Sequence, residues 1–177
     1  MEYPAEVLPP ENSFNGAGVY TLHYRGIFPL YSDIAEDSPI YVGKADPAGR
    51  RQGRGRGAMT TTTLYRRLQQ HADSISAADN LDLQDFRCRW LVLDPVWIGL
   101  TEQTLIAEYH PLWNIVVDGF GNHDPGSGRR NQRRSQWDTL HPGREWASIL
   151  QDREETVETI TSAIETFLSN RGRRLNP

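Results

Sequence analysis

Apolar residues recur along the chain in two kinds of pattern. Three short runs rich in β-branched and aromatic residues, at 18–24, 39–43 and 86–93, predict β-strands. Two longer runs, at 60–75 and 100–109, repeat apolar positions at helical spacing and predict helices. The order of these elements indicates an α+β fold with a three-stranded antiparallel sheet flanked by helices.

The rest of the chain is read from the same pattern. Residues 1–17 are expected to be a loose lead-in, and 115–117 a short strand or extension. Residues 118–144 are rich in glycine and polar side chains and are expected to form a long basic loop. Residues 145–170 predict one C-terminal helix.

Length and composition favour one globular domain. The 177 residues, 37% of them hydrophobic, suffice for a single core, so we expect one domain over 1–177. We find no apolar run long enough for a membrane span and no apolar leader at the N-terminus. Cys88 is the single cysteine, which excludes an internal disulfide. We therefore expect a cytoplasmic protein without a membrane partner.

The net charge is −4, but the charges are unevenly distributed. One lysine accompanies 18 arginines, and many of the acids follow residue 151, so the molecule can carry a basic face despite its negative total charge. Solvated loops are the alternative interpretation of the arginine clusters. Two clusters hold much of the positive charge: Arg50, Arg51, Arg54 and Arg56, then Arg129, Arg130, Arg133 and Arg134.

Candidate chemical groups lie on the predicted elements. Arg67 and His71 are four residues apart and share one helix face. Glu102 is expected in the first turn of its helix, where a carboxylate often serves only the helix dipole. Tyr20 and Tyr41 lie on separate strands. Taken singly, each group fits an ordinary structural role.

The order of these groups resembles the GIY-YIG nuclease superfamily. Gly18-Val-Tyr20 and Tyr41-Val-Gly43 resemble the two motifs that name it. Arg67-x-x-x-His71 resembles its helix-borne pair, and the segment from Glu102 to Asn114 resembles its metal-binding segment. Arg67 is preferred to the adjacent Arg66 because it shares a face with His71. The match covers roughly 18–117.

Two departures resemble the restriction-endonuclease branch of that superfamily. The two tyrosine motifs are widely separated, and residues 45–58 are inserted before the arginine. Residues 41–45, YVGKA, and the segment 118–146 also resemble that branch. Its known members cut CCGCGG as dimers or higher oligomers. The resemblance therefore implies a type II enzyme that cuts double-stranded DNA at a GC-rich palindrome as a homodimer or higher homo-oligomer.

The resemblance also implies roles for the site residues. Glu102 would bind Mg²⁺, for which Mn²⁺ could substitute, and Arg67 would grip the scissile phosphate. Tyr20 is the candidate acceptor of the water proton, with Tyr41 and His71 as alternatives that position the water or relay the proton. Asn114 would brace the site.

Double-stranded DNA is the partner that the resemblance implies, and the planar fork of arginine matches a guanine edge. A nuclease of DNA repair or mobile elements, a non-catalytic DNA-binding protein on the same scaffold and an RNA-directed nuclease are the alternatives. Residues 118–144 are expected to form the DNA-recognition loop. The expected DNA-binding residues are Lys44, Arg50, Arg51, Arg54, Arg56, His123, Arg129, Arg130, Asn131, Gln132, Arg133 and Arg134.

Overall fold

A computed structural model describes residues 4–47, 60–124 and 132–175, with side chains as far as Arg171. Its centre is one antiparallel sheet, ordered β1-β4-β2-β3. Three strands confirm the sequence prediction, namely β2 (Gly18–Tyr24), β3 (Pro39–Ala45) and β4 (Phe86–Val92). The fourth, β1 (Glu6–Val7), was missed because two exposed residues carry no alternating pattern.

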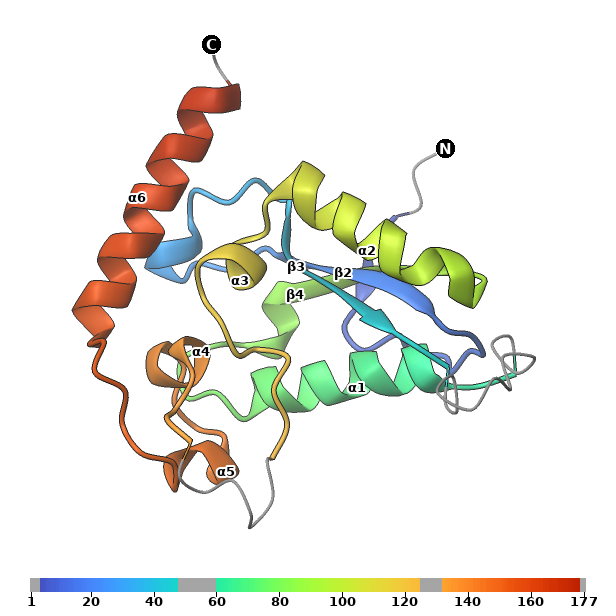
Figure 1. The fold of residues 1–177 in the computed structure, drawn as a ribbon, viewed down its shortest axis with the longest axis horizontal. Helices are drawn as coiled ribbons and strands as arrows, with labels where there is room; N and C mark the ends of the chain where they lie inside the picture. The colour runs from blue at the N-terminus through green and yellow to red at the C-terminus, as the bar shows by residue number, and fades with distance from the viewer. Residues whose placement is uncertain (1–3, 48–59, 125–131, 176–177) are drawn as a thin grey trace.

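Helices cover both faces of the sheet. Figure 1 shows α1 (Thr63–Ser76) along one face and α2 (Pro95–Tyr109) along the other. Alternate residues of β2 point to the two sides. Tyr20 and Leu22 join the main core with α1, and Val19 packs with Ile98 of α2. Within the described residues, no helix is long and apolar enough to cross a membrane.

The helix α2 begins five residues earlier than predicted. Pro95, which lies between the predicted strand 86–93 and the predicted helix 100–109, is its first residue, where the missing N–H costs nothing. The carboxylate of Asp94 caps the helix by accepting from the backbone N–H of Val96 at 3.1 Å. Glu102 is consequently the eighth residue of α2, so the expectation that it lies in the first turn is wrong, and the alternative role in the helix dipole falls with it.

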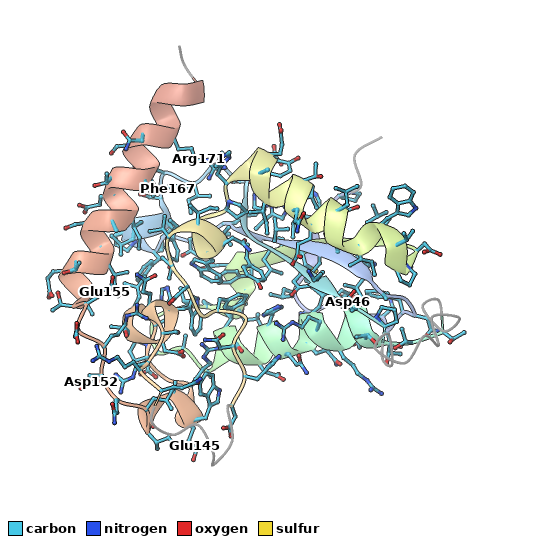
Figure 2. All side chains as sticks on the ribbon, in the orientation of Figure 1. Asp46, Glu145, Asp152, Glu155, Phe167 and Arg171 are labelled. Atoms are coloured by element: carbon cyan, nitrogen blue, oxygen red, sulfur yellow. The ribbon has the colours of Figure 1, made fainter. Side chains whose placement is uncertain are left out.

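The C-terminal third also differs from the prediction. Residues 115–117 form no strand, because α3 (Leu112–Ile115) includes the first of them. The expected loop contains α4 (Gln136–Leu140), capped by the Ser135 side chain. The single C-terminal helix is wrong: α5 (Glu145–Ser148) and α6 (Val157–Leu175) are separate. Arg171 of α6 donates to the carbonyl of Tyr109 at the end of α2 (Figure 2).

A buried polar chain ties these elements together. The indole N–H of Trp113 donates to the Tyr31 hydroxyl at 3.0 Å, and that hydroxyl lies 2.5 Å from Nε2 of His141. Nδ1 of His141 lies 2.8 Å from Oδ1 of Asn80, whose Nδ2 donates to Leu140. All groups are satisfied when Tyr31 donates to His141 and Nδ1–H donates to Asn80, which requires a neutral imidazole.

We expect His141 to make folding stability dependent on pH. Burial, with a smaller effect of Arg144, lowers its pKa from 6.5 to about 3, so the folded protein resists its protonation while the unfolded chain accepts a proton below 6.5. Stability is therefore fully present above pH 6.5 and lost as the pH falls. One such histidine lowers the free energy of unfolding by about 1.4 kcal/mol per pH unit.

Urea unfolding at several pH values between 6.5 and 5 measures this slope, above the range where most carboxylates titrate. His141→Gln should reduce the slope by about the contribution of one group, whatever its stability at pH 7. An unchanged slope would show that His141 does not carry this dependence.

Candidate active site

The two motif tyrosines lie side by side on the α1 face of the sheet. Tyr20 is opposite Gly43 and Tyr41 is opposite Leu22 in the β2–β3 register, and the two rings are 6.2 Å apart. A Cβ atom on Gly43 would overlap the Tyr20 hydroxyl. Glycine in the second motif is therefore needed because the side chain of Tyr20 passes over it. In the first motif, a Cβ on Gly18 would overlap the carbonyl oxygen of Leu91.

His71 of α1 lies directly beneath the tyrosines. Its Nε2 is 2.6 Å from the Tyr20 hydroxyl, and both side chains are almost fully buried. Burial lowers the pKa of His71 well below 6.5, with Arg67, His123 and Arg144 acting in the same direction. Burial also raises the pKa of Tyr20. At neutral pH the pair is uncharged, so Tyr20 donates its proton to a neutral imidazole.

The guanidinium of Arg67 extends from α1, one turn before His71. It donates to the carbonyl of Gly121 at 3.0 Å and to Gln70 at 3.2 Å, and it contacts Nε2 of His123. The Cα of Gly121 lies against both this guanidinium and the Tyr41 hydroxyl, because a Cβ there would be 2.9 Å from that hydroxyl. Arg67, Tyr41 and the segment around Gly121 therefore form one cluster.

Tyr41 differs from Tyr20 and His71 in being only partly buried. Burial raises the pKa of its hydroxyl, while the positive charge of Arg67 and a hydrogen bond with Tyr20 lower it. The charge of Glu102 has a raising effect, which places that carboxylate within electrostatic reach of the hydroxyl. Of the three candidate proton acceptors, Tyr41 is the least buried.

Glu102 approaches the cluster from the opposite face of the sheet. Its Oε2 lies 2.5 Å from Nζ of Lys44, the β3 residue expected to touch a DNA phosphate. The Glu102 side chain is 17% exposed and that of Lys44 is 37% exposed. Both side chains are therefore only partly buried, so the pair is accessible at the surface.

Asn114 braces the outer edge of the sheet. Its side-chain oxygen accepts from the N–H of Val42 at 2.8 Å, and its amide nitrogen donates to the carbonyl of Val42 at 2.8 Å. Because β3 is an edge strand, these backbone groups have no strand partner on that side. The carboxamide takes the place of a neighbouring peptide unit and joins α3 to β3.

The residues present suit a hydrated Mg²⁺ better than a tightly coordinated metal. Among the described residues, no group of three or more His, Cys, Asp or Glu side chains could hold a metal ion. Glu102 is instead a single carboxylate at an accessible position. Mg²⁺ commonly takes one or two protein carboxylates, several waters and phosphate oxygens, so the donor set fits that ion.

The two described arginines of the second cluster are paired with carboxylates that follow residue 151. Arg133 pairs with Glu154 at 2.7 Å, and Arg134 pairs with Asp152 at 3.2 Å and donates to Ala147. Figure 2 places Asp152 and Glu155 in the connection between α5 and α6, alongside this cluster. The sequence predicted one continuous helix over 145–170. The residues between α5 and α6 form a connection instead, and this connection brings the acids next to Arg133 and Arg134.

The other predicted DNA-binding residues fall into two groups. Gln132 and Arg133 are exposed and line a cavity with His123 and Trp146. The remainder lie outside the described residues: Arg50, Arg51, Arg54, Arg56, Arg129, Arg130 and Asn131.

Sequence reasoning missed three residues next to the site. Phe120 stacks on His71, with centroids 4.5 Å apart and planes inclined by 17°. Gly121 supplies a carbonyl to Arg67, and Arg144 donates to several carbonyls of this segment. The glycines of residues 118–128 signalled an irregular segment, but no local pattern indicated where it folds.

Comparison with protein-family models identified one match. The model described as "Eco29kI GIY-YIG domain" matches residues 12–168, which includes every site residue discussed above. A search of curated proteins gave no match.

Replacing Gly43 tests the packing around Tyr20. Gly43→Ala should displace the Tyr20 hydroxyl from His71, because the new methyl group would occupy its position. Ultraviolet titration and a crystal structure of the variant should show a Tyr20 hydroxyl that has moved and lost its short hydrogen bond. Gly99→Ala is the matched control, since a Cβ there meets no atom within 4 Å. An unmoved hydroxyl would contradict the steric argument.

Replacing Asn114 tests the brace on β3. Asn114→Ala should lower the free energy of unfolding by about 1–3 kcal/mol, because it leaves two backbone groups of Val42 without partners. Chemical denaturation measures this loss. Gln103→Ala, at an exposed position of α2, is the control and should change stability by less than about 0.5 kcal/mol. Equal effects of the two substitutions would refute the brace.

Proposed function

The chain belongs to the Eco29kI GIY-YIG domain family, and we propose that it is a type II restriction endonuclease. It would hydrolyse both strands of double-stranded DNA, in the presence of Mg²⁺, at a GC-rich palindrome such as CCGCGG. The observation that carries the proposal is the cluster of Tyr20, Tyr41, His71 and Arg67, together with the Glu102–Lys44 pair on the strand that also carries Tyr41. These residues come from four separate elements.

Phosphodiester hydrolysis needs a deprotonated water and compensation of charge on the phosphate. Arg67 supplies a fixed cation whose direction is set by the Gly121 carbonyl, so its guanidinium would contact the scissile phosphate. Glu102 would hold Mg²⁺, which when bound offsets negative charge on the phosphate and on the leaving oxygen. Lys44, whose Nζ lies 2.5 Å from Oε2 of Glu102, would pair with that carboxylate until the metal ion binds.

The burial of the three candidate proton acceptors suggests an order among them. Tyr41 is the least buried of the three, so its oxygen would receive the water proton. Its own proton would pass to Tyr20 and that of Tyr20 to Nε2 of His71, along the hydrogen bonds between these groups. The raised pKa of Tyr20 disfavours Tyr20 as a free phenolate that acts first.

A palindromic target also suggests the assembly. Two identical sites related by a two-fold axis would let each strand of the palindrome meet one site, so we propose a homodimer or higher homo-oligomer. Sedimentation of the free protein and of its DNA complex tests this part independently of cleavage.

Cleavage of a defined plasmid tests the function. The protein should linearise a plasmid with one CCGCGG site in Mg²⁺ or Mn²⁺, leave it intact in EDTA, and spare a plasmid without the site. Mapping the ends on a larger DNA identifies the sequence if a different palindrome is cut. DNA binding with no cleavage under any divalent ion would instead favour the non-catalytic DNA-binding alternative.

Glu102→Gln tests the metal role. The cleavage rate should fall by about 10²-fold or more, since the neutral amide is a poor ligand for Mg²⁺, while the affinity for DNA in Ca²⁺ stays within about threefold. Glu108→Gln, on an exposed face of the same helix, is the matched control and should cleave normally. Normal cleavage by Glu102→Gln would overturn the assignment.

A further inference from the structure

Arg144 is a buried cation close to the proposed active site, yet it contacts none of the reacting groups. Its side chain is only 2% exposed, and Nε donates to Oδ1 of Asp138 at 2.6 Å. The guanidinium carbon lies 4.5 Å from the ring centre of Trp137 and 4.7 Å from that of Trp146. The two indoles and the carboxylate leave this group one orientation.

The remaining donors of Arg144 bind one short segment. Nη1 donates to the carbonyls of Phe120 and Asn122, both at 3.2 Å, and Nη2 donates to that of Gly119 at 3.1 Å. These residues lie outside any helix or strand, so regular secondary structure does not provide donors for their carbonyls. The guanidinium of Arg144 therefore supplies hydrogen-bond donors to three of the four carbonyls of residues 119–122.

The same segment contacts the proposed catalytic groups on its other side. The ring of Phe120 stacks on His71 and lies 4.9 Å from that of Tyr41. The carbonyl of Gly121 accepts from Nη2 of Arg67. A shift of this segment would thus uncover His71 and release Arg67 at the same time.

We propose that Arg144 is a positioning residue for the phosphodiester hydrolysis, holding residues 119–122 so that Phe120 covers His71 and Gly121 orients Arg67. This inference rests on the proposed function, because it assigns Arg67 and His71 to that reaction. Lysine cannot replace Arg144, since a single ammonium group does not reach Asp138 and three carbonyls in different directions.

Arg144→Lys is the decisive variant because it keeps the charge next to Asp138. Its single-turnover cleavage rate on the CCGCGG plasmid, at saturating protein, should fall about 10–100-fold, as expected when reacting groups are displaced by about 1 Å. Its affinity for the same DNA in Ca²⁺ should stay within about threefold. Arg153→Lys is the matched control, because Arg153 bridges Asp118 and the carbonyl of Arg134 without contacting residues 119–122.

A double-mutant cycle tests the path from Arg144 to His71. Phe120→Leu removes the stacking ring and should lower the rate by itself. If Arg144 acts through this segment, the double variant should be little slower than the slower single variant. Rate losses that multiply, or an Arg144→Lys enzyme as fast as Arg153→Lys, would overturn the proposal.

The positioning can also be measured without cleavage. In wild-type protein the Phe120 ring should shift the carbon-bound ring protons of His71 upfield in NMR spectra, because the two rings are stacked. In Arg144→Lys these signals should move back towards free histidine, and in Arg153→Lys they should not. Unmoved His71 signals in Arg144→Lys would refute the inference, whereas an inactive wild-type protein with the expected shifts would refute only the proposed function.

Discussion

The outer edge of β3 is the constraint on which the candidate site depends. Tyr41 points to the α1 face and Lys44 to the α2 face, as alternation along a strand requires. Groups from the two helices can meet only where no further strand follows. Asn114 satisfies the N–H and carbonyl of Val42 without adding a strand, so the sheet ends at β3 while these polar groups remain paired.

The part of the site that the sequence predicted lies on elements with strong local patterns. The strands of Tyr20 and Tyr41 and the helix of Arg67 and His71 were predicted because β-branched runs and helical apolar spacing are local signals. The start of α2 was missed although Asp94-Pro95 is a common helix beginning, because the same pair also ends the preceding strand.

The remainder depends on contacts between distant residues that no local period encodes. Phe120 reaches His71 across 49 positions, and Arg144 binds carbonyls more than 20 positions away. The segments that carry them are irregular or form helices of a few residues, so apolar spacing is uninformative there. The ion pairs of Arg134 with Asp152 and of Arg133 with Glu154 also join residues that are distant in sequence, so the positions of the charges along the chain did not predict them.

These ion pairs bear on how a protein of net charge −4 could bind a polyanion. Arg133 and Glu154 are both more than half exposed, and exposed pairs of this kind contribute about 0–1 kcal/mol. Breaking this ion pair so that a DNA phosphate can bind Arg133 would therefore cost little free energy. The release of counterions from the DNA would favour binding. Arg144 differs from Arg133 because its ion pair with Asp138 is buried, and losing one partner of a buried pair is costly. Arg144 therefore stabilises the fold and is not available to bind DNA.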